Sequence, residues 1–132
     1  MLFRSPLMSY QHALIALLWS EADEDGTPFD SIDAPVSSAL QERIKQDWYT
    51  FYDAAITLGF DAVEHRTWPI DYSQGDEWDY AAHDFILTRN GHGVGFWETG
   101  RWSAPWSDKL TRLAEQFGEL HCYLHDGEIH AE

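Results

Sequence analysis

Residues 84–98 read DFILTRNGHGVGFWE, the strongest local pattern in the chain. The Asn-Gly pair at 90–91 stands between two apolar runs, and such pairs are typical of two-residue hairpin turns because both turn positions need a positive φ. A turn closed at this pair would place Phe85 opposite Phe96 on one face of the ribbon. The stretch therefore predicts a β-hairpin and, with it, an antiparallel sheet.

A second hairpin is predicted near the end of the sequence. Leu120, Cys122 and Leu124 alternate with polar or aromatic residues, which is the period of a half-buried strand. The pair Asp126-Gly127 then offers a tight turn into residues 128–130. Two hairpins together predict a sheet of three to four antiparallel strands.

Three helices are predicted to pack on one face of that sheet. Apolar residues at helical spacing favour helices over 10–22, over 38–58 before Gly59, and from about Ser103 or Ser107 to Gly118. Ser38 and Gln41 fit a capping box, and Pro105 fits a first helical turn. We expect a polar loop over 23–35 and an irregular connection over 60–82. The predicted fold class is α+β.

Length and composition favour one domain. The chain has 132 residues, of which 44% are hydrophobic, enough for a core of its own. We expect a single domain over 1–132, with residues 1–8 either disordered or an extension from an upstream start, Met8 being the alternative first residue. The apolar run 13–19 is too short for a transmembrane span and is followed by acidic residues, unlike a signal peptide.

The charge is strongly negative. Eight Lys and Arg stand against 23 Asp and Glu, a net charge of −15. Such a chain is repelled by nucleic acids and by anionic membranes, so a basic partner is favoured. Most of the acid lies in residues 21–79, and a dense acidic field can imitate a phosphate backbone. Its single cysteine, Cys122, has no intramolecular disulfide partner, which fits a cytoplasmic protein.

Metal sites and catalytic motifs are not indicated. Residues 21–26 resemble the first half of a calcium-binding EF-hand loop, but Ile32 stands where the twelfth position needs a bidentate glutamate. The seven histidines show no zinc-ligand spacing. We therefore predict no metal, no cofactor and no catalytic residue. The enzymatic alternative is a small enzyme that uses His83, His92 and Glu98.

The segment His83 to Glu98 resembles a core shared by small acidic proteins of bacteriophages and prophages, HDFxLTRNGHGxGFW followed by Asp or Glu. The likeness is close over these residues and loose over about half the chain. The Trp-rich stretches 68–78 and 102–106 depart from it. The resemblance implies a phage-type protein in the cytoplasm of a bacterial host, an inhibitor of host defence such as an anti-CRISPR or anti-restriction protein, with no catalytic residues.

Together these observations predict a non-enzymatic protein that binds a basic host protein or ribonucleoprotein complex, as a nucleic-acid mimic. The predicted contact residues are Asp23, Glu24, Asp25, Asp30, Asp33, Asp71, Asp76, Glu77, Asp79, Trp68 and Trp78. The tryptophans at 68, 78, 102 and 106 fall in predicted connections, where they either anchor an interface or cover the core. If they are exposed, a structural protein that assembles through them is the alternative. The oligomeric state stays open.

Overall fold

The computed structural model describes residues 5–92, 95–97 and 101–132. Over these ranges, the chain forms mainly helices. In order they are the 3-10 helix η1 (Pro6–Ser9), α1 (Tyr10–Ser20), the 3-10 helix η2 (Phe29–Ser31), α2 (Ser38–Thr57), α3 (Ala62–His65), α4 (Glu77–Arg89) and α5 (Trp106–Glu115), followed by the strands β1 (Cys122–His125) and β2 (Glu128–Ala131).

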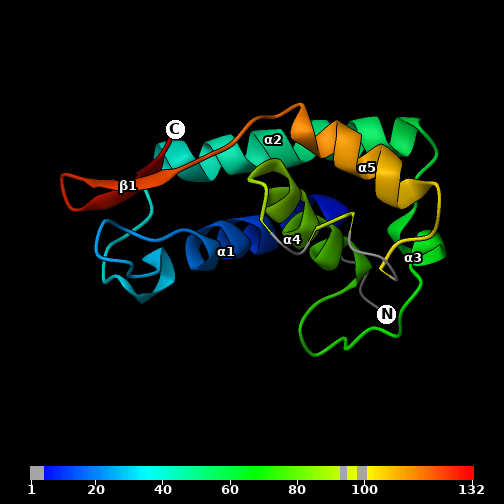
Figure 1. The fold of residues 1–132 in the computed structure, drawn as a ribbon, viewed down its shortest axis with the longest axis horizontal. Helices are drawn as coiled ribbons and strands as arrows, with labels where there is room; N and C mark the ends of the chain where they lie inside the picture. Colours follow the sequence, from blue (N-terminus) through cyan, green and yellow to red (C-terminus); the bar gives the residue numbers. More distant parts are fainter. Residues whose placement is uncertain (1–4, 93–94, 98–100) are drawn as a thin grey trace.

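Helix α4 is the centre of the fold. It packs against α1 on one side and against α5 on the other, and α2 contacts both α1 and α5. Figure 1 shows α2 and α5 along one edge, α1 beneath them, the β-hairpin at one end and α3 at the other. Nearly every residue of α4 is buried, including its polar ones, so this helix has no solvent-facing stripe.

The hairpin predicted over 84–98 is wrong, because this stretch is the second half of α4 and the segment after it. Asp76 and Asp79 form a reciprocal capping box that starts the helix. At the other end Gly91 has a φ of +70°. Its N–H bonds the carbonyl of Thr88, and the next N–H, of His92, bonds that of Leu87. This is a Schellman C-terminus, which requires the same positive-φ glycine as a hairpin turn.

The second predicted hairpin is confirmed. Strands β1 and β2 pair antiparallel, with His125 opposite Glu128, and both turn residues, Asp126 and Gly127, have positive φ. Within the described residues, however, the sheet has only these two strands, so the α+β class holds and a sheet of three to four strands is not found. Ile129 also forms an isolated parallel β-bridge with Val36, which connects the hairpin to the segment before α2.

The helices predicted over 10–22 and 38–58 are confirmed as α1 and α2. The cap of α2 is Ser37 rather than Ser38, because the Ser37 hydroxyl accepts the Leu40 N–H at 3.0 Å. The third predicted helix is present as α5, without a serine side-chain cap. The supposed connection over 60–82 contains α3 and the start of α4. Residues 6–8 belong to η1, and the Pro6 carbonyl accepts the Trp48 indole N–H at 3.1 Å.

The core is aromatic. Trp48 is fully buried against Phe51, Trp78 and Phe85, while Phe60 packs on Trp78 and on two further tryptophans, 102 and 106. Trp78, Trp102 and Trp106 are at most 9% exposed. The tryptophans of the predicted connections therefore cover the core, with Trp68 half-buried at its edge. None of the described helices is long and apolar enough to cross a membrane.

Candidate interaction surface

Buried polar residues in the described part of the 83–98 segment hydrogen-bond distant parts of the chain. Asp84 is fully buried and accepts hydrogen bonds from Arg101 at 3.0 and 3.2 Å and from the Trp102 indole at 2.8 Å. It also bonds the Nδ1 of His83 at 3.0 Å. A buried carboxylate is costly unless it is paired and hydrogen-bonded, and these partners fix residues 101–102 against α4.

Arg89 and Asn90 hold the segment after α5 against α4. The Arg89 guanidinium, whose side chain is 0% exposed, donates to Asp47 at 2.8 Å and to the carbonyls of Phe117 and Gly118 at 2.9 and 2.8 Å. Burial lowers the pKa of Arg89, and Asp47 opposes that shift. The Asn90 amide bonds both the N–H and the carbonyl of Leu120. Most of the described residues that carry the resemblance to phage proteins are thus buried.

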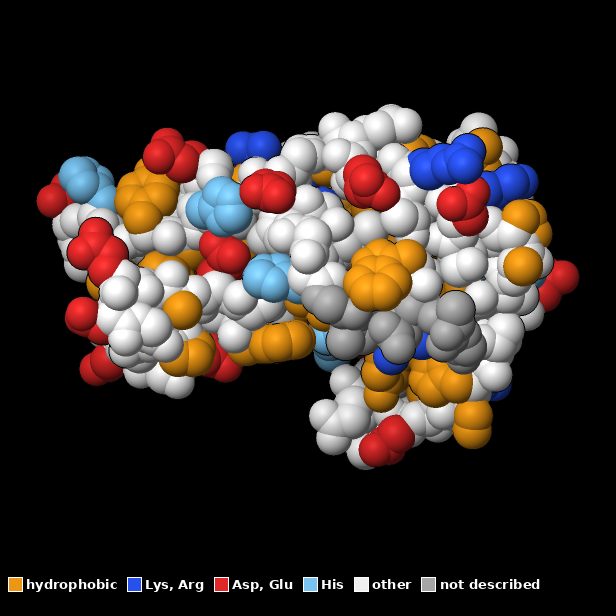
Figure 2. All heavy atoms as spheres, viewed as in Figure 1, with side chains coloured by type: hydrophobic (Ala, Val, Ile, Leu, Met, Phe, Trp, Pro, Cys, Tyr) orange, Lys and Arg blue, Asp and Glu red, His pale blue; other side chains and the backbone are white. Residues whose placement is uncertain are grey.

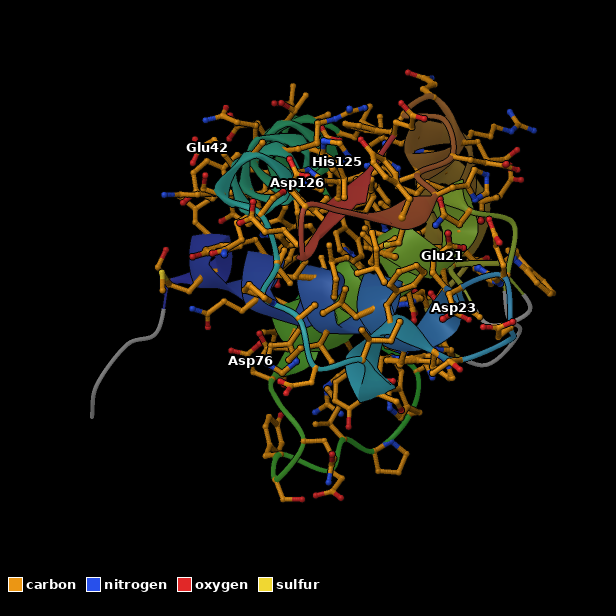
Figure 3. The ribbon with its side chains drawn as sticks, turned by 90° about the vertical axis from the view of Figure 1, so that its left-hand side faces the viewer. Glu21, Asp23, Glu42, Asp76, His125 and Asp126 are labelled. Atoms are coloured by element: carbon orange, nitrogen blue, oxygen red, sulfur yellow. The ribbon has the colours of Figure 1, made fainter. Side chains whose placement is uncertain are left out.

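The structure gathers acidic residues at one end of the molecule. Residues 21–37 and 119–132 contain no Lys or Arg. They lie together because Glu21 accepts the Cys122 N–H at 3.1 Å and lies 3.2 Å from His121, and because Ile129 exchanges backbone hydrogen bonds with Pro35 and Ser37. We call these two segments the acidic end. Figure 3 looks onto it, with Glu21 and Asp23 on one side and His125 and Asp126 on the hairpin.

A recess of about 430 Å³ lies between the two segments of the acidic end. One wall carries Asp23, Glu24 and Asp25, and the other carries Tyr123 and Leu124, which are 40% and 47% exposed. Figure 2 shows carboxylate and histidine side chains around apolar ones at this end. An exposed apolar centre with a charged rim is the usual anatomy of a protein interface.

Among the described residues of the acidic end, histidine rings are the groups that pair with carboxylates. Its exposed carboxylates are those of Glu24, Asp25, Asp30, Asp33, Glu119, Asp126 and Glu132. Hydrogen bonds that the His121 ring donates to Glu119 and Glu21 raise the pKa of His121 above 6.5. Among the described residues, Glu24, Asp25, Asp30 and Asp33 form no ion pair. Burial raises the pKa of the Cys122 thiol to about 12, so this cysteine is not a nucleophile at neutral pH.

The predicted contact residues divide into outward and inward groups. Glu24, Asp25, Asp30, Asp33 and Asp71 are exposed. Asp23 is half-buried, and its carboxylate accepts the N–H groups of residues 25 and 27, which shapes the loop.

The inward group belongs to the start of α4. Glu77, Trp78 and Asp79 are buried, and Asp76 caps the helix, so these four residues are structural in this fold. The sequence pattern had placed them in an irregular loop, where acidic side chains are normally solvated.

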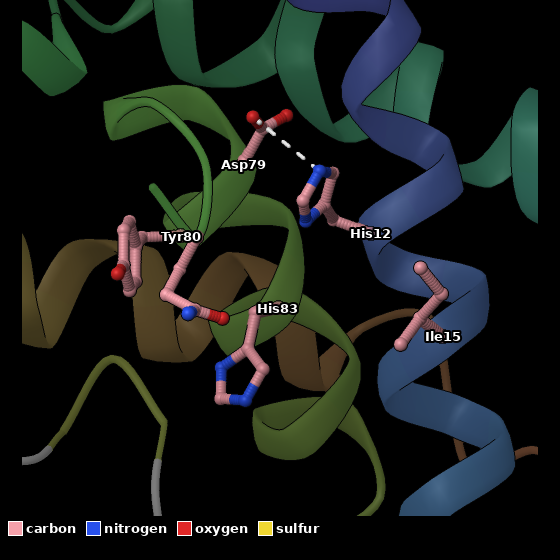
Figure 4. A pocket seen from close by; sticks show the side chains of 6 residues that line it. His12, Ile15, Asp79, Tyr80 and His83 are labelled. Carbon is pink, nitrogen blue, oxygen red and sulfur yellow. Dashed lines mark ion pairs between the residues drawn. The ribbon is translucent and has the colours of Figure 1, made fainter. Parts of the chain in front are cut away.

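A pocket that the sequence did not indicate lies between α1 and α4. Its volume is about 360 Å³, and it is lined by His12, Ile15, Gln74, Asp79, Tyr80 and His83. Figure 4 shows the two imidazole rings projecting into it from facing helices. The His12 Nε2 lies 3.4 Å from the buried Asp79 carboxylate, and the His83 ring stacks on Trp19. The nearest sequence signal was the adjacent pair His83-Asp84.

The residues of the enzymatic alternative are not brought together as far as the structure describes them. His83 contacts Asp84 and Trp19, whereas the Nε2 of His92 lies 3.5 Å from Glu21 at the acidic end. Glu98 lies outside the described residues. In the described part of the chain, no three His, Cys, Asp or Glu side chains are grouped as a metal site would need.

Comparisons with known proteins give the chain no family. No protein-family model matches it, and no match is found among curated proteins or among solved structures. The resemblance of residues 83–98 to phage proteins therefore stays a prediction from those residues.

Proposed function

We propose that this protein acts by binding a basic partner through the acidic end. The carrying observation is that two segments without a single Lys or Arg, 21–37 and 119–132, fold against each other and expose their carboxylates. Ordinary solubility needs only scattered charge. Here the acid is concentrated around a recess that also presents Tyr123 and Leu124.

The physical basis is electrostatic attraction followed by short-range packing. A net charge of −15 on 132 residues draws a basic surface over long distances. Removal of the exposed tyrosine and leucine from water then adds the hydrophobic contribution that keeps the complex together. Glu24, Asp25, Asp30 and Asp33 are the carboxylates we assign to contact, and Asp23 holds their loop in shape.

The partner we propose is a nucleic-acid-handling protein or ribonucleoprotein of a bacterial host, which the protein inhibits by occupying a phosphate-binding groove. Two things support this class: a basic groove for nucleic acid is the complement of a clustered acidic surface, and residues 83–98 resemble those of phage proteins. The protein acts in this proposal without catalysis.

The test is capture from a bacterial lysate on the immobilised protein, at low salt and at about 0.5 M salt, where screening shortens electrostatic reach to a few ångströms. We expect a basic nucleic-acid-binding protein to be retained at low salt, released at high salt and displaced by added DNA or RNA. Retention that changes neither with salt concentration nor with added nucleic acid would contradict the proposal.

A further inference from the structure

We infer that the pocket between α1 and α4 receives the guanidinium group of an arginine side chain. This rests on the proposed function in one respect, since the arginine we assign belongs to the basic partner. The pocket lies beside the exposed side chains of Ile15 and Trp19, which are 57% and 44% exposed on α1, the helix that leads into the acidic end.

The first step of the argument is the protonation pattern of the two histidines. The His83 Nδ1 bonds Asp84 at 3.0 Å, and the His12 Nε2 faces Asp79 at 3.4 Å. A carboxylate only accepts, so the facing ring nitrogen carries the proton and the other nitrogen of a neutral imidazole is an acceptor. No partner for that other nitrogen is found among the described residues for either ring. With both rings in these neutral tautomers, the pocket presents two acceptors.

The second step is the charge of the group that matches them. Asp84 is balanced by Arg101, and Asp79 accepts the Ser9 hydroxyl at 2.7 Å. None of the described residues that line the pocket is Lys or Arg. Two acceptors on a protein of net charge −15 favour a cationic donor over an anion or a second acceptor.

The third step separates guanidinium from ammonium. A guanidinium is planar, offers several donors in a fixed plane and stacks on aromatic rings, whereas an ammonium is a compact point charge. Trp19 stacks on His83 with ring centroids 5.8 Å apart, which sets an aromatic face next to the acceptors. A volume of about 360 Å³ is at the lower end for ligand pockets and suits one side chain rather than a cofactor.

The test uses the intact chain and NMR of its histidine rings. The probe is a capped Gly-Arg-Gly peptide, and the matched control is the same peptide with citrulline, which has the shape of arginine without its charge. We expect saturable shifts of the His12 and His83 ring signals with the arginine peptide and none of comparable size with citrulline. Equal shifts, or no saturable shift, would overturn the inference.

Variants locate the site. We expect His12→Phe and His83→Phe each to weaken peptide binding on the order of tenfold, because each removes a hydrogen bond to a charged group. His65→Phe is the same substitution on α3, at the end of the molecule opposite to the β-hairpin, and should leave binding unchanged. Urea unfolding verifies the fold of each variant, and the citrulline comparison stands even if a variant fails to fold. Equal weakening by all three variants would overturn the inference.

Two further experiments distinguish a partner's arginine from a small guanidinium compound and separate this inference from the proposed function. Agmatine is a free guanidinium compound, and tighter binding of agmatine than of the peptide would assign the pocket to a small molecule and overturn the partner assignment. If the lysate yields no basic partner while the arginine peptide still shifts both histidines, the proposed function fails and the guanidinium pocket stands. If a partner is captured equally well by His12→Phe and His83→Phe, its arginine does not use this pocket.

Discussion

At the scale of single residues, the buried polar side chains of α4 stabilise the fold by hydrogen-bonding other segments of the chain. Asp84, Arg89 and Asn90 are buried, and each hydrogen-bonds a segment that is distant in the sequence. The pattern Thr88-Arg89-Asn90-Gly91, which looked like a turn with a polar pair beside it, is a helix end that holds residues 95–96 and 117–120 in place.

Arg89→Met is predicted to destabilise the protein by about 3 kcal/mol, because it leaves Asp47 and two carbonyls without their buried donor. Urea denaturation gives the free energy of unfolding. The matched control is Arg112→Met, at a side chain that is 77% exposed and pairs with Asp108 on the helix surface. It should change stability by less than about 0.5 kcal/mol. Similar losses of unfolding free energy in the two variants would contradict the stabilising role of Arg89.

The candidate site could be predicted only in part at this scale. Glu24, Asp25, Asp30 and Asp33 were predicted as exposed contacts because proline, glycine and acid mark a solvated loop. Glu77 and Asp79 were grouped with them by charge alone, and nothing in composition distinguishes a capping carboxylate from a solvated one. The pocket was missed because His12 and His83 are 71 residues apart and meet only through the packing of α1 on α4.

At the scale of elements, helix ends decide the fold. The sequence predicted α1, α2, α5 and the last hairpin, whose spacing and turn residues agree with each other. It missed α4 because this helix is buried all round, so its apolar residues show no single stripe, and because Asn-Gly serves both hairpin turns and helix C-termini. Burial in the tertiary structure determines that this stretch is a helix, and a local sequence pattern does not contain that information.

Ser37→Ala is predicted to cost about 1 kcal/mol, because the Ser37 hydroxyl satisfies the Leu40 N–H at the start of α2. Ser38→Ala is the control one residue away. Ser38 is exposed inside the first turn, and alanine should be neutral or slightly stabilising there. Thermal unfolding of both variants measures the difference, and a larger loss for Ser38→Ala would move the cap back to the position that the capping-box pattern favoured.

The attachment of the hairpin to the loop after α1 is predicted to weaken as pH rises. Glu119 and Glu21 raise the pKa of His121 above 6.5, so protonated His121 adds stability that is fully present below pH 6.5 and is lost as pH rises through the raised pKa. NMR titration of the His121 ring measures that pKa. Glu119→Gln should lower it, while Glu132→Gln should not. Equal pKa values in all three proteins would refute this account of the pair.

At the scale of the whole molecule, basic and acidic residues lie in different places. Of the basic residues that the structure describes, Arg89 and Arg101 pair inside the molecule, whereas the others lie on α2, directly after α3 and on α5. The two segments of the acidic end contain no Lys or Arg, and we propose this end as the surface that binds a basic partner. Because this arrangement depends on long-range folding of residues 21–37 against 119–132, the sequence showed the acidity of the first segment but not its union with the second.

The most direct test of that claim compares two variants of equal net charge for capture of a basic partner from lysate. The first, Glu24→Gln/Asp25→Asn/Asp30→Asn/Asp33→Asn, neutralises the acidic end, and the second, Asp53→Asn/Glu64→Gln/Asp108→Asn/Glu115→Gln, removes the same number of carboxylates from α2, α3 and α5. We predict that the first variant loses roughly tenfold in affinity and the second little, since the lost contacts are local. Equal loss in both, or loss in neither, would contradict the acidic end as the binding surface.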